Sequence, residues 1–595
     1  MNTASRLLQQ HAGSCALRQP IRSWRDLPRK RAASPGHRTC ARRKTCTSAA
    51  AGNQASGEHS GQKPYVVTTP LYYVNAAPHM GSAYSTIATD VAARFHRLKK
   101  EQPVVFITGT DEHGEKIAAA AEAKQVSPQD HCDTVAAEFK DLWEKFDIST
   151  DSFVRTTQPS HERLVQALLQ RIYDKGDIYK AAYEGHYCVG CEKYMDEEEM
   201  GPNHTCPTHR TECKLRQEEN YFFKLSKYQQ QLEQLLQDQP DFVQPAPRRN
   251  EVLGWIKSGA KDFSISRSKV EWGIRIPWDP SQTIYVWIDA LHGYMSALLD
   301  DNQDVSLHTL DRITEAGWPA DVHVIGKDIL RFHAVMWPAL LMSAELPLPG
   351  KVFAHGFLTK DGHKMGKSLG NVLDPNVLVD AYGSDAVRFF FLKEVTFGSD
   401  GDFSEERFQN IVNANLANDI GNLLNRSLNL LHKFCDGEYP VDSSDAPESA
   451  VLRELATRQA EAAVQAYERW DFSGAAEAVL AISGRGNGYM EEQAPWGTLK
   501  KGNDEQKAQG RQVLADVLEA LRIVALLISP ITPRLALAMY TQLGFSEEHF
   551  KQLSLADVAW GGLKEGHALS KPVPVFKRID QEFVTEPAAA VAGKR

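Results

Sequence analysis

The spacing of apolar and polar residues predicts a strand–helix–strand unit near the start of the chain. Residues 65–69 form an apolar run typical of a buried strand, and 104–108 form a second short run rich in β-formers. Between them, residues 79–98 place their apolar side chains at helical spacing. A helix that links two strands in this way is typical of a parallel, doubly wound sheet. We therefore expect an α/β domain, Rossmann-like in type, with a ligand site beyond the carboxyl ends of its strands.

The later pattern predicts that this sheet is split by an insertion and followed by helices. Residues 130–180 look helical, whereas 186–220 are rich in turns, charges and cysteines, and 243–249 are typical of a connection back. Strand-like runs return at 283–288, 322–325 and 352–357. From about residue 410 to about residue 543 the spacing is mostly helical, which predicts a separate all-α domain.

Composition and charge exclude several classes of protein. With 42% apolar and 24% charged residues in 595, most of the chain can bury a core, and no run of 18 apolar residues exists to span a membrane. Residues 1–57 carry nine Arg, two Lys and one acid, Asp26, which leaves 56 basic against 75 acidic residues in the rest. Such a leader is typical of an organellar transit peptide, and a disordered basic tail is the alternative. Because the remainder is acidic, any nucleic-acid site must be a local basic surface.

Two short motifs have the features of a nucleotide site. His-Met-Gly-Ser at 79–82 opens the predicted first helix, where free N–H groups and the positive end of the helix dipole suit phosphate. Lys-Met-Gly-Lys-Ser at 364–368 follows the last strand-like run, and its lysines can neutralise charge as pyrophosphate leaves. Each motif alone also fits an ordinary structure: a capping histidine beside a packing glycine, and a solvated loop.

Together the two motifs are the paired signature of the class I aminoacyl-tRNA synthetases. The region from about residue 63 to residue 580 resembles the methionyl-tRNA synthetases, and is similar to the bacterial-type enzymes of plant and algal organelles. The segments that carry the resemblance are Thr-Pro-Leu-Tyr-Tyr-Val-Asn-Ala-Ala-Pro-His-Met-Gly at 69–81, Thr-Gly-Thr-Asp-Glu-His-Gly at 108–114, Tyr-Val-Trp-Ile-Asp-Ala at 285–290, Ile-Gly-Lys-Asp-Ile at 325–329, Asn-Leu-Ala-Asn-Asp-Ile-Gly-Asn at 415–422 and Glu-Gln-Ala-Pro-Trp at 492–496. Ser82 stands where many class I enzymes have His, and Gly366 where Ser is usual.

The resemblance implies a reaction and the residues that perform it. The methionine carboxylate attacks the α-phosphorus of ATP in line, without a general base, and the methionyl group then passes to the terminal ribose of tRNA(Met). The residues implied at the methionine site are Leu71, Tyr73, Trp287, Tyr294, Ile329 and His333 for an apolar slot, Asp111 for the ammonium group and Arg267 for charge balance. The residues implied at ATP, which brings Mg²⁺, are the catalytic His79, Gly81, Ser82, Lys364 and Lys367 at the phosphates and Asp328 at the ribose.

A group of cysteines in the insertion predicts a metal site. Cys188-x2-Cys191 and, after fourteen residues, Cys206-x2-His209 provide four ligands for one tetrahedral, structural Zn²⁺. Cys213 could replace His209 or be a bystander, and a knuckle without metal is the remaining alternative. The insertion is also too short for the editing domain of the isoleucine, valine and leucine enzymes, which favours methionine.

The helical region is implied to bind the anticodon. Asn422 and Arg426 share one helix face, and Trp496 offers a ring for stacking, which is how unpaired loop bases are recognised. An exposed polar face is the ordinary alternative for the Asn–Arg pair. No further tRNA-binding or dimerisation module is expected after this region, so we expect a monomer.

The expected organisation therefore has seven parts. They are a transit peptide (1–62) for a chloroplast, a mitochondrion or both, the first half of the catalytic domain (63–185), a zinc-bearing insertion (186–250), the second half (251–395), a stem-contact linker (396–415), the anticodon-binding helical domain (416–560) and a C-terminal tail (561–595). Two other functions stay open: a nucleotidyltransferase with the same sheet, which would usually be shorter, and an RNA-binding paralogue without catalysis.

Overall fold

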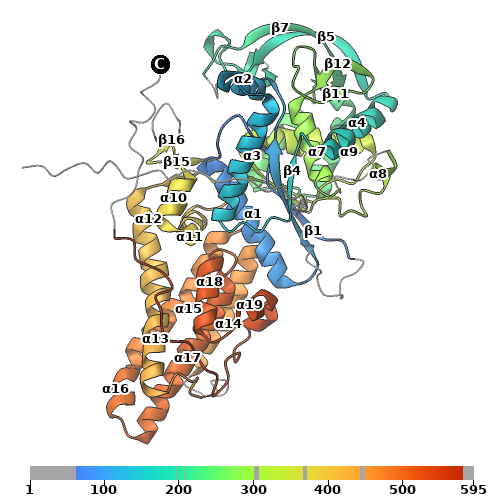
Figure 1. Cartoon of the computed structure of the whole chain (residues 1–595). Helices are drawn as coiled ribbons and strands as arrows, with labels where there is room; N and C mark the ends of the chain where they lie inside the picture. The colour runs from blue at the N-terminus through green and yellow to red at the C-terminus, as the bar shows by residue number, and fades with distance from the viewer. Residues whose placement is uncertain are drawn as a thin grey trace, which may run out of the picture. The chain divides into compact units, whose positions relative to one another are not determined.

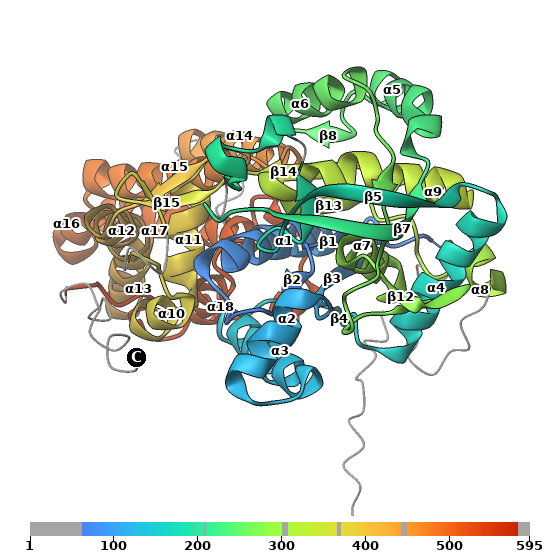
Figure 2. The same cartoon turned by 90° about the horizontal axis from the view of Figure 1, so that it is seen from above.

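A parallel β-sheet forms the centre of the structure, a computed structural model that describes residues 62–195, 197–207, 210–299, 307–365, 371–441 and 449–580. Its strand order is β2-β3-β1-β13-β14-β8, and β4 also pairs with β3. The strands are β1 Tyr65–Thr68, β2 Tyr72–Tyr73, β3 Val104–Asp111, β4 Ser152–Arg155, β8 Val243–Gln244, β13 Val322–Gly326 and β14 Val352–His355. β1 pairs with β3 on one side and with β13 on the other, so the order switches at β1 (Figure 2). The expected doubly wound sheet is thus confirmed.

Helices cover both faces of this sheet, because neighbouring residues on each strand face opposite ways. Val67 and Phe106 pack in one apolar cluster with α1 (Met80–Lys99), whereas Val66 and Ile107 pack in another. The second cluster includes side chains of α4 (Pro159–Asp174), α7 (Val286–Ser296) and α9 (Trp337–Ala344). A sheet covered on both faces needs strands that are apolar throughout, which is why the run at 65–69 could be recognised from sequence.

Two segments differ from the predicted pattern. The sequence predicts a strand at 283–288, but β12 covers Asp279–Ile284 and α7 begins at Val286. Most of this run is buried, and the apolar spacing of a short buried run cannot distinguish helix from strand. Residues 130–180 were expected to be helical, yet β4 lies between α3 (Pro128–Lys145) and α4 as an edge strand of the central sheet.

The insertion forms an antiparallel sheet with the order β6-β5-β7-β9. Its strands are β5 Ile178–Cys188, β6 Lys193–Met195, β7 Lys214–Phe223 and β9 Phe263–Ser264. In the sequence, β5 leads into the cysteine cluster and β7 follows it. The sheet therefore begins before residue 186, the expected start of the insertion. Two helices, α5 (Gln229–Asp238) and α6 (Ala246–Lys257), flank β8, which returns the chain to the central sheet beside β14 (Figure 2).

The remaining elements include two three-stranded sheets and the helical domain. One sheet has the order β10-β12-β11, with β10 Ser266–Arg267 and β11 Arg275–Ile276, and two helices, α2 Glu115–Lys124 and α8 Leu307–Asp311, also belong to this part of the chain. The other sheet, of order β16-β15-β17, contains β15 Leu358–Lys360, β16 His363–Lys364 and β17 Gly401–Phe403. The helices that follow, shown in yellow to red in Figure 1, are α10 Pro375–Tyr382, α11 Ser384–Glu394, α12 Glu405–Val412, a π-helix Asn413–Gly421, α13 Asn422–Phe434, α14 Ala450–Glu468, α15 Phe472–Gln493, α16 Pro495–Lys501, α17 Asp504–Ile528, α18 Pro533–Gln542 and α19 Glu547–Gln552. Within the described ranges, no helix has the length and apolar character needed to cross a bilayer.

A buried arginine joins the helical domain to the α/β domain. Arg388 on α11 is fully buried and donates hydrogen bonds to the carbonyl oxygens of Pro530 and Ile531, each at 2.8 Å. Its guanidinium also pairs with Asp90 on α1 at 2.7 Å. Because removing one partner of a buried ion pair leaves the other charge uncompensated, Arg388 fixes how the two domains pack.

Candidate functional site

The first nucleotide motif lies directly beyond the switch point of the sheet. β1 ends at Thr68, and the loop after it leads to α1, whose N-cap is the exposed His79. The His79 Nδ1 accepts a hydrogen bond from the Ser82 backbone N–H at 3.3 Å, so this histidine caps the helix. Capping does not conflict with the nucleotide role, because the ring remains at a helix N-terminus, where anions are favoured. The phosphate contact itself stays a prediction.

Gly81 and Ser82 hold the His79 side chain in place. A Cβ atom on Gly81 would lie 2.9 Å from His79 Cε1, so the glycine leaves room for the imidazole. The buried Ser82 hydroxyl donates to the His79 carbonyl at 2.8 Å and accepts from the His79 N–H at 3.1 Å. Both residues therefore support the histidine, and the contacts expected between them and a nucleotide stay predictions.

The lysine motif follows a tight β-hairpin between β15 and β16. Asp361 and Gly362 form its turn with φ values of 52° and 74°, the left-handed conformation that two-residue hairpins favour. Asp402 on β17 fastens the hairpin from the side: it accepts hydrogen bonds from the Thr359 hydroxyl at 2.6 Å and from the Gly362 N–H at 2.8 Å. The approach to the lysine loop is thus held by the strand that precedes the helical domain.

Lys364 is the last residue of β16, and the loop continues from it. The predicted Lys367 and the unusual Gly366 lie in 366–370, outside the described residues. The structure therefore fixes where the lysine loop starts, and the triphosphate clamp stays a prediction.

The residues of the predicted methionine slot come together on one face of the sheet. Five of them belong to or pack against a single apolar cluster: Leu71, Tyr73, Trp287, Tyr294 and Ile329. A Cβ atom on Gly293 would lie 2.3 Å from Leu71 Cδ1, so a glycine in α7 is what lets Leu71 approach. The ring of Trp287 stacks on Phe332 with centroids 4.3 Å apart. Phe332 was not among the sequence-predicted residues, although it lies only three positions after Ile329.

His333 closes the slot as a neutral ring. Its Nδ1 donates to the Ile329 carbonyl oxygen at 3.0 Å, which leaves Nε2 to accept from the Tyr294 hydroxyl at 2.7 Å. Burial lowers the pKa of His333 to about 4, so the imidazole carries no charge at neutral pH. His333 lies in a π-helical segment, Phe332–Met336, a form that is frequent at functional sites. A neutral slot lined by aromatic rings suits a thioether.

Asp111 ends β3 with a buried, unpartnered oxygen. Its side chain is buried, and Oδ1 has no hydrogen-bond partner among the described residues. Burial, together with the nearby charges of Asp289 and Glu192, raises the pKa of Asp111 well above the usual range of an aspartate. An ammonium group bound at Oδ1 would satisfy the oxygen and lower this pKa.

Arg267 and Asp328 line one cavity of about 540 Å³ beside the slot. Arg267 is buried and donates to the Ser266 carbonyl oxygen at 2.7 Å, while its guanidinium lies 4.0 Å from the centre of the Tyr285 ring. Its Nε has no partner within the part of the chain that the structure describes. Phe332 also lines this cavity, so the predicted ribose residue Asp328 and the ring that stacks on the predicted slot residue Trp287 share one space.

A buried charge network behind Asp111 had not been predicted from sequence. Asp289 is almost fully buried and accepts from His113 Nδ1 at 2.7 Å and from His161 Nε2 at 2.6 Å. Although burial acts in the opposite direction, the two imidazoles lower the pKa of Asp289 to about 2. Asp289 and His113 lie within the motifs at 285–290 and 108–114, which was a usable signal, whereas nothing in the local sequence distinguishes His161.

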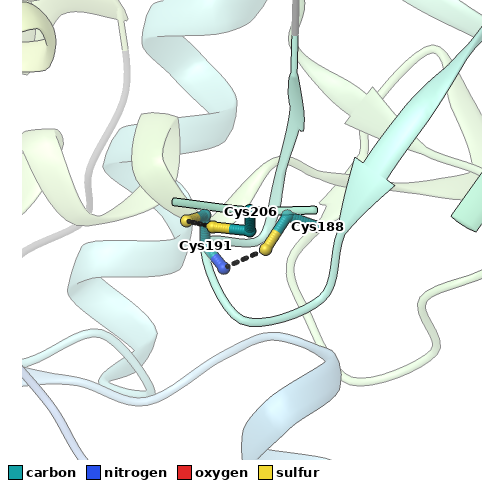
Figure 3. A group of neighbouring side chains, drawn as sticks. All are labelled: Cys188, Cys191 and Cys206. Atoms are coloured by element: carbon teal, nitrogen blue, oxygen red, sulfur yellow. Dashed lines mark hydrogen bonds between the residues drawn. The ribbon is translucent and has the colours of Figure 1, made fainter. Parts of the chain in front are cut away.

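Three cysteines of the insertion form a compact group (Figure 3). The Sγ atoms of Cys188, Cys191 and Cys206 all lie within 4.8 Å of one another, and the Cys191 N–H donates to Cys188 Sγ at 3.4 Å. A thiol set of this size, with an N–H directed at one sulfur, fits a tetrahedral zinc site that needs one further ligand. Cys213 is buried in the same cluster, whereas His209, the predicted fourth ligand, lies outside the described residues.

The predicted anticodon residues lie close together on the helical domain. The Arg426 guanidinium is 5.8 Å from the centre of the Trp496 ring, and Trp496 is 37% exposed. Arg426 forms an ion pair with Glu491 and also donates to Asn487 Oδ1 at 3.4 Å. Asn422 is exposed at the start of α13, one turn before Arg426. The arrangement offers a stacking ring, a cation and an amide to an unpaired base.

Comparison with known proteins agrees with this geometry. The chain matches the family described as tRNA synthetases class I (M) over residues 65–214 and 201–428, and the anticodon binding domain of methionyl tRNA ligase over 440–595. It is 53% identical over 535 residues to the chloroplastic/mitochondrial methionine–tRNA ligase of Arabidopsis thaliana, which covers 90% of this chain and 85% of that one. The methionine–tRNA ligase of Synechocystis is 48% identical over 526 residues, 87% of this chain and 98% of its own.

A solved structure is similar over the same range. The Mycobacterium tuberculosis methionyl-tRNA synthetase in complex with methionyl-adenylate has a TM-score of 0.82 and 40% identity, and the match covers 87% of this chain and 100% of that one. These matches confirm the predicted fold class and exclude the shorter nucleotidyltransferase. The chain belongs to the class I methionyl-tRNA synthetases, with their Rossmann-like catalytic domain and helical anticodon-binding domain.

Proposed function

We propose that this methionine–tRNA ligase charges tRNA(Met) for translation in an organelle, a chloroplast, a mitochondrion or both. Ligation of methionine to tRNA is the activity of its family, and the finer step is the location. Two observations support the organelle: the Arg-rich, acid-poor composition of residues 1–57, and the chloroplastic/mitochondrial name of the Arabidopsis relative. Residues 1–61 lie outside the described residues, so the transit peptide is supported by composition alone.

The observation that carries the proposed site is the buried, unpartnered oxygen of Asp111. It stands at the carboxyl end of β3, next to the switch point, where a doubly wound sheet binds its ligand. The methionine ammonium group would pair with this oxygen, which directs the methionine side chain into the aromatic slot around Tyr294 and Trp287. The substrate carboxylate is already ionised and would face ATP, so no residue needs to remove a proton.

On the ATP side, the chain's residues position and neutralise charge. His79 at the start of α1 would donate to a phosphate oxygen, and Asp328 in the shared cavity would accept from a ribose hydroxyl. Lys364 and Lys367 would offset the charge that moves onto pyrophosphate as it leaves. Mg²⁺ enters with ATP as part of the substrate.

The insertion is proposed to hold one structural Zn²⁺ through Cys188, Cys191, Cys206 and a fourth ligand. The metal would cross-link the turn after β5 to the segment before β7. His209 and Cys213 are the candidates for the fourth position. Metal content per chain, measured by mass spectrometry on His209→Ala and Cys213→Ser, separates them, because only the ligand's replacement lowers zinc occupancy.

The helical domain is proposed to hold the tRNA anticodon at Asn422, Arg426 and Trp496, and the chain to act as a monomer. Stacking on Trp496 and hydrogen bonds from the other two side chains would select the unpaired bases. Light scattering of the purified protein with and without tRNA tests the monomer: a mass near 66.3 kDa for the free chain agrees with it.

The experiment that tests the reaction is amino-acid-dependent ATP–pyrophosphate exchange by residues 63–595, offered each of the twenty amino acids. Exchange with methionine alone is expected. Exchange with another amino acid would overturn the slot assignment, and no exchange by a folded, zinc-loaded sample would favour the non-catalytic RNA-binding paralogue. A fusion of residues 1–62 to a fluorescent protein, offered to isolated chloroplasts and mitochondria, tests the location separately.

A further inference from the structure

Glu192 directly follows Cys191 in the cysteine knuckle, the turn-rich segment that holds Cys188, Cys191 and Cys206. It is a buried acid whose side chain contacts the catalytic domain. It is 4% exposed, and the Tyr73 hydroxyl donates to its Oε1 at 2.8 Å. Tyr73 is a wall of the predicted methionine slot and lies 119 positions away in the sequence. A hydrogen bond to a carboxylate is stronger than one between neutral groups, so this contact fixes where the Tyr73 ring stands.

The same oxygen of Glu192 holds the segment that carries Asp111. The Lys116 N–H, in the first turn of α2, donates to Glu192 Oε1 at 2.8 Å. The N-cap of α2 is Gly114, which has no side chain to serve the helix, so Glu192 supplies the capping acceptor from a distant element. A Cβ atom on Gly114 would lie 2.6 Å from Glu192 Oε2, so the glycine leaves room for this carboxylate. Because only three residues separate the end of β3 from the start of α2, the position of α2 determines where Asp111 lies.

Cys191, the residue before Glu192, contacts a third part of the predicted methionine slot. The Trp287 Nε1–H donates to the Cys191 carbonyl oxygen at 3.4 Å. Two consecutive residues, Cys191 and Glu192, therefore contact two aromatic residues of the predicted slot, Tyr73 and Trp287, and the first turn of α2. Residues 191–192 are the point at which the predicted zinc site and the predicted methionine slot meet.

The backbone conformation of Glu192 gives an independent reason to assign a role to its side chain. Its φ is 50°, the left-handed region where glycine is the ordinary residue and a side chain costs energy. Strain of this kind persists where the surrounding structure uses the strained residue. Here the side chain forms two hydrogen bonds that glycine could not form.

We propose that Glu192 is a positioning residue that couples the cysteine knuckle to the methionine slot, and that it sets the affinity for methionine through Tyr73 and the Asp111 loop. This inference rests on the proposed function, since it assumes that the slot binds methionine. It assigns Glu192 no contact with substrate. Its effect should therefore appear in the KM for methionine and not in the KM for ATP.

The test compares Glu192→Gly, Glu192→Gln and the control Glu184→Ala in methionine-dependent pyrophosphate exchange by the full chain. Glycine removes the carboxylate and also relieves the strain of the left-handed backbone conformation. This variant should therefore keep its melting temperature and its zinc content. Its KM for methionine should rise about tenfold, the loss expected for a hydrogen bond to a charged group. Glu192→Gln keeps an acceptor and should stay within about threefold of wild type. Glu184 is exposed on β5, and its replacement should change neither KM.

A double-mutant cycle with Tyr73→Phe supplies the readout that a merely structural role would not move. Tyr73→Phe should raise the KM for methionine in the wild-type background and have no further effect in Glu192→Gly, because the bond is already lost. An unchanged KM in Glu192→Gly, or effects of the two changes that simply add, would overturn the inference. Absence of methionine-dependent exchange in the wild type would instead refute the proposed function, so the two failures are distinguishable.

Discussion

Replacing Asp111 with asparagine should weaken methionine binding while making the ligand-free protein more stable. The amide keeps the shape of the side chain and removes the charge that would pair with the ammonium group. A hydrogen bond to a charged group contributes about 1.5–3 kcal/mol, which corresponds to an increase of about 10- to 150-fold in the Kd for methionine. The KM for ATP should change little, because no ATP residue is assigned to β3.

Stability should change in the opposite direction, because the carboxylate of Asp111 is buried without a partner for Oδ1. Its pKa is raised above the ordinary value of 3.8, so the folded state binds this proton more tightly than the unfolded state does. The contribution of Asp111 to stability is therefore greatest below pH 3.8 and is lost as the pH rises through the raised pKa. At pH 7 the buried carboxylate therefore lowers the free energy of unfolding of the wild type. The asparagine variant should be more stable by about 1 kcal/mol, the lower end of the cost of an unsatisfied buried polar group.

Urea unfolding without ligands at pH 7 and pH 5, and equilibrium dialysis with labelled methionine, would measure the two effects. The gain in stability should shrink at pH 5. Asp133→Asn is the matched control, because Arg155 lies 2.6 Å away and lowers the pKa of Asp133, so this exposed carboxylate stabilises the fold at neutral pH. That variant should lose no more than about 1 kcal/mol and bind methionine normally. An Asp111→Asn variant with wild-type methionine affinity, or with lower stability at pH 7, would refute the reasoning.

Three further perturbations test other parts of the structure. Arg388→Met should lose about 3 kcal/mol in urea unfolding, because Asp90 and two carbonyl oxygens lose a buried donor; a loss below about 1 kcal/mol would contradict this role. Trp496→Ala should raise the KM for tRNA in aminoacylation about 5- to 100-fold through lost stacking, with the KM for methionine in exchange as the internal reference. Asp402→Ala should free the hairpin before the lysine loop and lower the kcat of exchange about tenfold at an unchanged KM for methionine, and a change confined to KM would argue against it.

The parts of the fold that could be predicted are those in which a single local pattern decides the structure. The expected helix at 79–98 is α1, Met80–Lys99, and the expected strand at 322–325 is β13, Val322–Gly326. The hairpin of β5 and β7 was not predicted as strands. In β5 the side chains alternate between partly buried and exposed over most of the strand, so only pairing between residues such as Ile178 and Phe223, far apart in sequence, defines it. Such pairings leave no signal in a short window.

The same limit applies to the site. Motif residues such as His79, Asp111 and Tyr294 could be named because each belongs to a recognisable segment. Glu192 and His161 could not, because what gives them a role is a partner more than a hundred positions away: Tyr73 for the first and Asp289 for the second. A lone Glu after a cysteine, or a lone His in a helix, has no pattern that separates it from a surface residue.

Two π-helical segments among the described residues show how the fold can position predicted binding residues without a change in overall topology. A π-turn inserts one residue into a helix and rotates the following side chains by about 100° relative to those before it. Phe332–Met336 contains His333, whose ring is thereby brought to bond with Tyr294. Asn413–Gly421 lies directly before Asn422 and so sets which face of α13 presents the predicted anticodon residues. Regular helical spacing across either segment would direct these side chains elsewhere, so each predicted binding site depends on an irregular turn that apolar periodicity does not predict.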